Sequence, residues 1–182
     1  MSPQRFGRAA IATCLAGLPT LFAGAAVAQG KGVVLVASGD WVATEQRDSP
    51  TAPPYLCSAL TRKAGRMFAI QANIVDTEAR FADPTWSQPA SVPGTLAIDV
   101  GAYSATLKVT DNTNNVAIAA ITPDQLRFMI GAMEKSNAMT VTPGPAAPDT
   151  LSLRGSNRAT DAFRACAAQL SAGHNGAPPP LQ

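Results

Sequence analysis

The stretch TLAIDVGAYSATLKVTDNTNNVAIAAITPDQLRFMIGAMEK, residues 95–135, decides the fold class because its apolar residues change period partway along. On either side of Gly101-Ala102 they alternate, which predicts a β-hairpin with strands at 95–100 and 103–110. From Leu126 to Met133 they recur every three or four residues, which is the period of an amphipathic helix. A hairpin followed by such a helix indicates a mixed fold.

The start of this helix is marked by its own residues. Thr122 is suited to the N-cap, Pro123 to the first helical position, and Gln125 to the third, where its side chain can complete a capping box. We therefore predict a helix at about 122–135. Its inward face would consist of Leu126, Met129, Ile130 and Met133.

Short β-rich runs separated by turn residues, some alternating and one, 33–37, continuously apolar, extend in both directions from this stretch. They predict further strands at 33–37, 40–46, 55–61, 66–75, 116–121, 138–142 and 150–153. A second helix is predicted at about 156–170, with Ala159, Phe163, Cys166 and Leu170 facing inward. The fold class expected is mainly β with two α-helices (α+β), an antiparallel β-sandwich-like sheet. The connection Asp76–Gly94 is predicted to hold no regular element.

The first 28 residues have the order of a secretory signal peptide. Arg5 and Arg8 precede an apolar segment, and Ala26-Val27-Ala28 supplies the small residues that signal peptidase requires. We predict cleavage after Ala28 and a periplasmic location, with secretion or association with the outer surface left open. The alternative is a retained membrane anchor, which Pro19 disfavours, so no stable membrane span is expected after cleavage.

The remaining chain is expected to form a single β-rich domain at 29–170, followed by a disordered Gly/Pro/Ala tail at 171–182. Loss of Arg5 and Arg8 leaves twelve Lys and Arg against twelve Asp and Glu, so the processed chain has no formal net charge. Nucleic-acid binding relies on clustered basic residues, and only Arg62, Lys63 and Arg66 lie close together. We therefore expect no nucleic-acid partner.

Two cysteines remain after cleavage, Cys57 and Cys166. An oxidising compartment favours their pairing, so we predict one disulfide that joins the second helix to a strand. The alternative is a redox or metal-binding pair. No C-x-x-C spacing and no neighbouring histidine support it.

Recognisable catalytic groups are missing from the sequence. The only histidine is His174, in the predicted tail. This in practice excludes a Ser-His-Asp catalytic triad or a Cys-His catalytic dyad. The glycines form no phosphate-binding motif, and no metal-ligating cluster is evident. We expect a protein that is not an enzyme, with no cofactor and no metal.

The connection 76–94 carries the candidate partner-binding residues. Asp76, Glu78, Asp83 and Trp86 lie close together in the sequence and combine acidic groups with one large aromatic ring. We interpret them as a candidate partner-binding loop. Trp86 could instead fold back onto the core, and the carboxylates could instead serve a glycosidase, which needs two carboxyl groups at a defined separation.

Several short motifs give the sequence a resemblance to a known family. They are Gly39-Asp40-Trp41, the following Cys57, the helix and strand at 122–142, and Leu151-Ser-Leu-Arg-Gly-Ser156 with Ala159 and Phe163. In this layout, together with the signal peptide, the chain resembles the invasion-associated locus B family of exported bacterial proteins. It departs from that family in lacking a cysteine at 111–121. The resemblance implies a β-sandwich-like periplasmic or surface-associated protein linked to host-cell interaction, with no catalytic residues to carry over.

We therefore expect a non-enzymatic exported interaction protein with an unknown protein partner in the envelope or the host. The resemblance implies a link to host-cell invasion or envelope function. The alternative is a small periplasmic inhibitor of a hydrolase such as lysozyme, with the 76–94 connection inserted into the active-site cleft.

Overall fold

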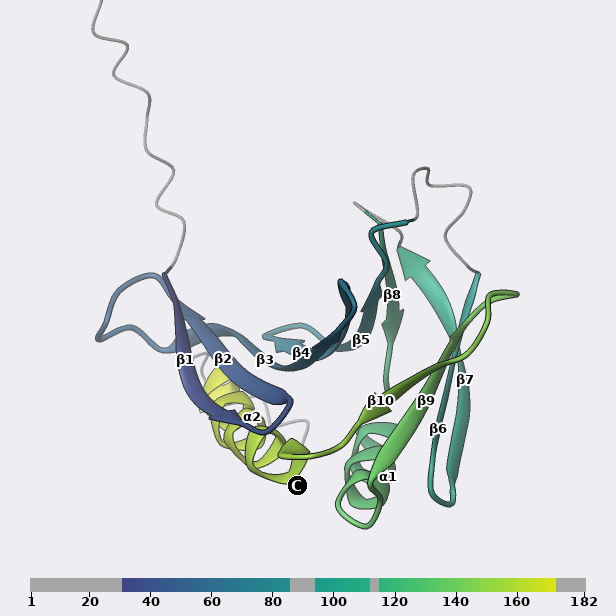
Figure 1. Cartoon of the computed structure of the whole chain (residues 1–182). Helices are drawn as coiled ribbons and strands as arrows, with labels where there is room; N and C mark the ends of the chain where they lie inside the picture. The colour runs from purple at the N-terminus through teal and green to yellow at the C-terminus, as the bar shows by residue number, and fades with distance from the viewer. Residues whose placement is uncertain (1–30, 86–93, 112–114, 173–182) are drawn as a thin grey trace, which may run out of the picture.

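The computed structural model describes residues 31–85, 94–111 and 115–172. Within these ranges the chain forms ten strands and two helices (Figure 1). The strands are β1 (Lys31–Ser38), β2 (Trp41–Arg47), β3 (Pro54–Lys63), β4 (Arg66–Asn73), β5 (Thr77–Ala82), β6 (Thr95–Val100), β7 (Tyr103–Asp111), β8 (Val116–Ala120), β9 (Ala138–Pro143) and β10 (Asp149–Ser152). The helices are α1 (Pro123–Met133) and α2 (Ser156–Ala172).

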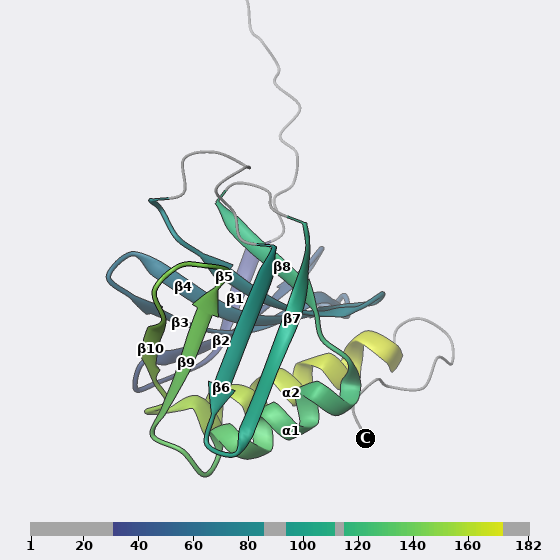
Figure 2. The same ribbon diagram turned by 90° about the vertical axis from the view of Figure 1, so that its right-hand side faces the viewer.

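The strands form one antiparallel sheet in the order β1-β2-β3-β4-β5-β8-β7-β6-β9-β10. Figure 1 shows that the sheet bends between β5 and β8, so that its two halves enclose the interior. Helix α2 lies against β1, β2 and β3, and α1 lies against β6 and β7 (Figures 1 and 2). The prediction of a mainly β, antiparallel α+β fold with two helices is confirmed, with the strands joined into one continuous sheet.

Both predicted helices occur close to their predicted bounds. Helix α1 starts with the expected capping box, in which the Thr122 hydroxyl accepts a hydrogen bond from the Gln125 backbone N–H and the Gln125 side chain accepts one from the Thr122 N–H. Helix α2 begins at Ser156 and extends to Ala172, two residues into the segment predicted as a tail. The predicted signal peptide and residues 173–182 lie outside the described residues.

The expectation that the connection 76–94 holds no regular element was wrong. Residues 77–82 form β5, which pairs with β4 on one side and β8 on the other. Thr77, Ala79 and Phe81 are buried, and the residues between them are partly exposed. The strand is short and half of its residues are polar or charged, so the alternation of apolar and polar residues is a weak signal in the sequence. The segment forms a strand because it pairs with a neighbouring strand on each side.

The core fills the space between the bent sheet and the two helices. Its largest fully buried side chains include Trp41, Phe68, Phe81 and Phe163, and the rings of Trp41 and Phe68 meet edge to face with centroids 6.3 Å apart. The predicted inward residues of both helices are all buried. Each of the Leu, Ile, Met and Phe side chains among them contributes about 1.5 to 3 kcal/mol when fully removed from water.

Two turns that are far apart in the sequence contact each other directly. The Trp41 indole N–H donates to the Ser152 carbonyl at 2.8 Å, and the Asp40 backbone N–H donates to the Arg154 carbonyl at 2.9 Å. Arg154 also forms an ion pair with the Asp40 carboxylate at 2.8 Å, which lowers the pKa of Asp40. The two short motifs 39–41 and 151–156 are therefore two sides of one contact, which ties the β1–β2 turn to the start of α2.

No helix within the described ranges has the length and apolar character that a membrane crossing demands.

Candidate functional site

The predicted disulfide between Cys57 and Cys166 is present. Cys57 lies in β3 and Cys166 in α2, with Cα atoms 5.9 Å apart and a separation of 109 positions along the chain. Cys57 is fully buried and Cys166 is 1% exposed. The bond therefore fixes α2 to the sheet from the inside, as expected from the sequence.

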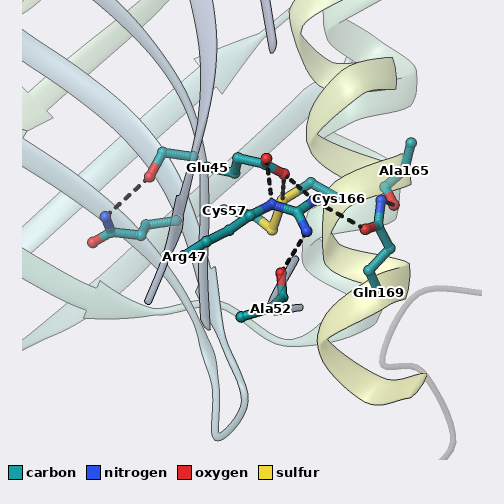
Figure 3. Close-up of a disulfide and its surroundings, with 9 residues drawn as sticks. Glu45, Arg47, Ala52, Cys57, Ala165, Cys166 and Gln169 are labelled. Carbon is teal, nitrogen blue, oxygen red and sulfur yellow. Dashed lines mark hydrogen bonds and ion pairs between the residues drawn. A yellow bond between two sulfur atoms is a disulfide. The ribbon is translucent and has the colours of Figure 1, made fainter. Parts of the chain in front are cut away.

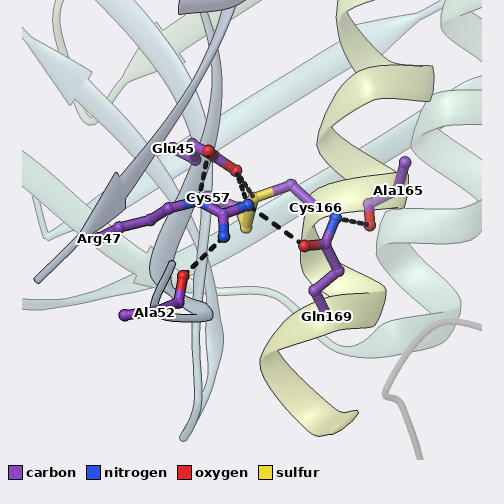
Figure 4. Close-up of polar contacts among 7 residues, drawn as sticks. All are labelled: Glu45, Arg47, Ala52, Cys57, Ala165, Cys166 and Gln169. Atoms are coloured by element: carbon purple, nitrogen blue, oxygen red, sulfur yellow. Dashed lines mark hydrogen bonds and ion pairs between the residues drawn. A yellow bond between two sulfur atoms is a disulfide. The ribbon is translucent and has the colours of Figure 1, made fainter. Parts of the chain in front are cut away.

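A buried ion pair lies beside this disulfide (Figure 3). Glu45, on β2, is 6% exposed and accepts two hydrogen bonds from the Arg47 guanidinium, the Nη2 to Oε2 distance being 2.8 Å. The same guanidinium donates to the Ala52 carbonyl at 2.6 Å and to the Gln169 side chain at 3.3 Å (Figure 4). Arg47 thus connects β2, the β2–β3 loop and α2 around the sulfur atoms.

This arrangement is suited to structure rather than to thiol chemistry. Glu45 Oε2 lies 3.9 Å from the Cys166 sulfur, but a disulfide sulfur carries no proton to donate, so this is a packing contact. A reactive cysteine needs access and an electropositive neighbour, whereas these sulfurs are enclosed and face a carboxylate. We interpret the bond as a structural one.

The structure places three of the four residues of the candidate partner-binding loop in different surroundings. Asp76 is exposed in the β4–β5 turn and accepts a hydrogen bond from the Asn73 amide at 2.6 Å. Glu78 lies on the outer face of β5 in an ion pair with Arg80 at 2.6 Å. Asp83 is buried just beyond the other end of β5. Trp86 lies outside the described residues, so the binding role of the loop stays a prediction.

This placement also bears on the glycosidase alternative. Asp76 and Asp83 flank the six residues of β5, which at 3.3 Å per residue puts about 20 Å between the two ends. Glycoside hydrolysis requires two carboxyl groups within roughly 5 to 10 Å of each other. The two aspartates therefore do not form such a pair.

Asp83 belongs instead to a cluster of two buried carboxylates and two partly exposed cations. Arg66 Nε lies 2.8 Å from Asp83 and its Nη1 lies 3.5 Å from Asp149, the first residue of β10. Burial alone would raise the pKa of Asp83, but hydrogen bonds from Thr85 and the Arg66 guanidinium outweigh it and lower that pKa. Lys63 adds a hydrogen bond to the Thr150 carbonyl at 2.6 Å.

The basic residues at the β3–β4 turn differ in their surroundings. Arg62 is exposed, but Lys63 and Arg66 fasten this turn to the edge strand β10. Their role in the described structure is to hold two distant parts of the sheet together.

A different surface has the features of a binding site. Between α1 and the β6–β7 turn lies a groove of about 650 Å³, which we call the α1 groove. Tyr103, Phe128, Gly131 and Ala132 supply much of its apolar lining, and Arg127 and Lys135 supply two positive charges. The volume is within the range of about 300 to 1,000 Å³ that is typical of ligand pockets.

The aromatic and basic groups of the α1 groove are accessible. Phe128 is 57% exposed although it is a large apolar side chain. The Arg127 guanidinium stacks over its ring at 4.6 Å from the centroid and pairs with Asp124 at 2.9 Å. Lys135 is exposed and has no ion-pair partner among the described residues. Burial raises the pKa of Tyr103, which keeps its phenol neutral.

The sequence contained a signal for this groove that went unused. Arg127, Phe128 and Lys135 all lie outside the apolar face formed by Leu126, Met129, Ile130 and Met133. Phe and Arg side chains are enriched at protein interfaces relative to the rest of the surface. The contribution of the β6–β7 turn required the tertiary structure.

The part of the chain that the structure describes holds no group of three or more His, Cys, Asp or Glu side chains suited to a metal ion.

Fold and site together define a disulfide-bonded α+β protein with a ten-stranded antiparallel sheet and an apolar groove flanked by cations. No protein-family model matches the chain. No curated protein matches its sequence. A solved structure, that of invasion associated protein B from Bartonella henselae, aligns with it at 9% sequence identity and a TM-score of 0.39, over 73% of this chain and 96% of that one. A score this low carries no inference about function, and the family resemblance stays a prediction.

Proposed function

We propose that this protein is an exported, non-enzymatic binding protein that contacts a partner protein through the α1 groove. The observation that carries the proposal is the exposure of Phe128 between two accessible cations, Arg127 and Lys135. Tyr, Trp, Phe and Arg side chains are enriched at protein interfaces, and the α1 groove presents Phe128, Tyr103 and Arg127 together.

The export part of the proposal is supported by the disulfide, because such bonds persist in oxidising compartments. The Arg-flanked apolar segment before Ala28 is consistent with it. We place the protein in the periplasm, and the family resemblance of the sequence suggests an envelope or host-cell partner. Intact mass of the protein recovered from a periplasmic extract, with and without reductant, tests both points. A chain that retains residues 1–28, or whose mass is unchanged by reduction, contradicts this part.

The binding part is tested by site-specific photocrosslinking in cells that express the full chain. A photoreactive phenylalanine analogue replaces Phe128 in one variant and Arg158 in a control, since Arg158 is exposed on α2, away from the groove. We expect a partner adduct of defined mass from position 128 and none from position 158. Equal adducts from both positions, or none from either, contradict the groove as the interface. Substrate turnover by the purified chain would contradict the non-enzymatic assignment.

The hydrolase-inhibitor alternative loses part of its basis, since Asp83 is buried and paired and is not free to enter a cleft. Lysozyme assays with the purified chain in micromolar excess remain its direct test.

A further inference from the structure

We infer that the α1 groove binds an extended acidic segment of a partner protein, in which two carboxylates flank one apolar side chain in the pattern acid-x-apolar-x-acid. This inference rests on the proposed function and specifies the chemistry of the partner. It follows from the spacing of Arg127 and Gly131 on α1 and of Lys135 in the turn that follows it.

The two cations of the groove are spaced for two separate carboxylates. Arg127 lies in α1 and Lys135 lies in the turn two residues after its end. Because Glu134 still has helical dihedral angles, a rise of about 1.5 Å per residue gives about 12 Å along the helix axis between the two positions. In an extended peptide, residues i and i+4 point to the same side and are about 13 Å apart. One carboxylate at each of these positions can therefore reach one cation.

The space between the cations suits an apolar side chain. Gly131 lies midway between Arg127 and Lys135, and a Cβ placed on it would meet no atom within 4 Å. The missing side chain leaves room over the helix, with Phe128 and Ala132 beside it and Tyr103 opposite on the β6–β7 hairpin. An apolar side chain at position i+2 of the same extended peptide points to this space.

The existing partners of the cations leave both able to bind. Asp124 occupies part of the Arg127 guanidinium, which has five N–H donors in a fork that suits carboxylates. Glu134, the neighbour of Lys135, pairs with Arg164 of α2 at 2.8 Å. Asp99 accepts a hydrogen bond from Ser104 beside the groove, and no ion pair between Asp99 and Lys135 is present in the described structure.

The test uses the purified full chain and fluorescein-labelled peptides, with binding measured by fluorescence anisotropy at low and high salt. The probe peptide contains Glu-Ser-Phe-Ser-Glu between Gly-Ser flanks. Three matched peptides replace both Glu by Lys, replace Phe by Ser, or move the two Glu next to each other. We expect the probe peptide to bind, each matched peptide to bind about tenfold more weakly or less, and high salt to weaken the binding.

Variants of the chain complete the test. The double variant Arg127→Glu with Lys135→Glu, and the variant Phe128→Ser, should each lose about tenfold or more in affinity for the probe peptide, because they remove the charge match or the apolar contact. Arg158→Glu should bind like the wild type. All four positions are exposed, so unchanged melting curves will confirm that the variants fold.

Failure of the probe peptide to bind, equal binding of the Lys peptide, or equal affinity of the double variant each overturns the inference. A crosslink from position 128 without binding of the acidic probe would show that the groove is an interface for a partner of other chemistry. The proposed function would then stand while the inference falls.

Discussion

Gly39 and Gly155 are residues at which the backbone leaves no room for a side chain. A Cβ on Gly155 would lie 1.9 Å from the Ser38 carbonyl oxygen, and one on Gly39 would lie 2.2 Å from that of Arg154. Both glycines also have positive φ, +89° and +56°, which side chains disfavour. At the scale of single residues, these glycines allow the two motif-bearing turns to meet.

We predict that Gly155→Ala lowers the free energy of unfolding by about 2 to 4 kcal/mol, because backbone atoms must move and the φ angle is strained. Gly131→Ala is the matched control: it lies in a helix with open space around its Cβ and should raise stability by about 0.5 to 1 kcal/mol. Chemical denaturation of both variants checks the pair. Equal effects of the two substitutions would disprove the close contact.

The lowered pKa of Asp83 predicts how the free energy of unfolding depends on pH. Its pKa is lowered in the folded chain, so the folded state binds fewer protons at this site than the unfolded state does. The stability that this group contributes is therefore complete above about pH 4 and is lost as the pH falls through the lowered pKa. Arg66 is partly exposed, and solvent screening limits the contribution to about 1 to 2 kcal/mol.

Asp83→Asn should therefore be less stable than the wild type at about pH 7, and the difference should shrink toward about pH 3. Urea unfolding of both proteins across this range measures it. A difference that does not change with pH would mean that the Asp83 carboxylate is not held ionised by Arg66 and Thr85.

At the scale of elements, α2 depends on tertiary contacts. It packs on β1, β2 and β3, and the Cys57–Cys166 disulfide and Arg47 attach it to the sheet. Helix α1 carries its own capping box, whereas α2 has no acidic residue in its first turn and no basic residue in its last turn to support its dipole. The bond to β3 is therefore expected to matter most for α2.

We predict that the double variant Cys57→Ala with Cys166→Ala loses about 3 to 5 kcal/mol of stability, since the bond closes a loop of 109 residues. Hydrogen exchange should accelerate more at 156–170 than at 123–133, because α2 loses its covalent anchor and α1 does not. Uniform acceleration across both helices would contradict a local role for the bond.

At the scale of the whole molecule, the first and last strands of the sheet belong to one folding unit. Trp41 and Asp40 contact residues 152–154, and Lys63 and Arg66 contact the start of β10. These contacts connect the two ends of the bent sheet. Trp41 and Ser152, which form one of them, are more than a hundred residues apart in the sequence. Neither half of the sheet can therefore lose structure without breaking them.

We predict a single cooperative unfolding transition. In a Trp86→Phe background, in which Trp41 alone reports, tryptophan fluorescence and far-UV circular dichroism should give the same denaturation midpoint. An earlier change in the Trp41 signal would show that the β1–β2 turn separates from residues 152–154 before the rest unfolds.

The sequence by itself determined the elements whose signals are local. The alternation of Leu96, Ile98 and Val100 and the capping residues Thr122 and Gln125 predict their own structure, because side-chain period and cap chemistry act within a few residues. The cysteine pairing also followed, because only Cys57 and Cys166 remain once the predicted signal peptide is removed, and two cysteines allow one bond.

Only the tertiary structure decided the rest. Strand β5 depends on two neighbouring strands that supply its hydrogen bonds. Asp83 pairs with Arg66, next to the β3–β4 turn, so its carboxylate is not free to contact a partner. The α1 groove forms because α1 lies beside the β6–β7 hairpin. Pairing, burial and concave surfaces arise from segments that are distant in the chain, and no period or motif within one segment encodes which distant segment will face it.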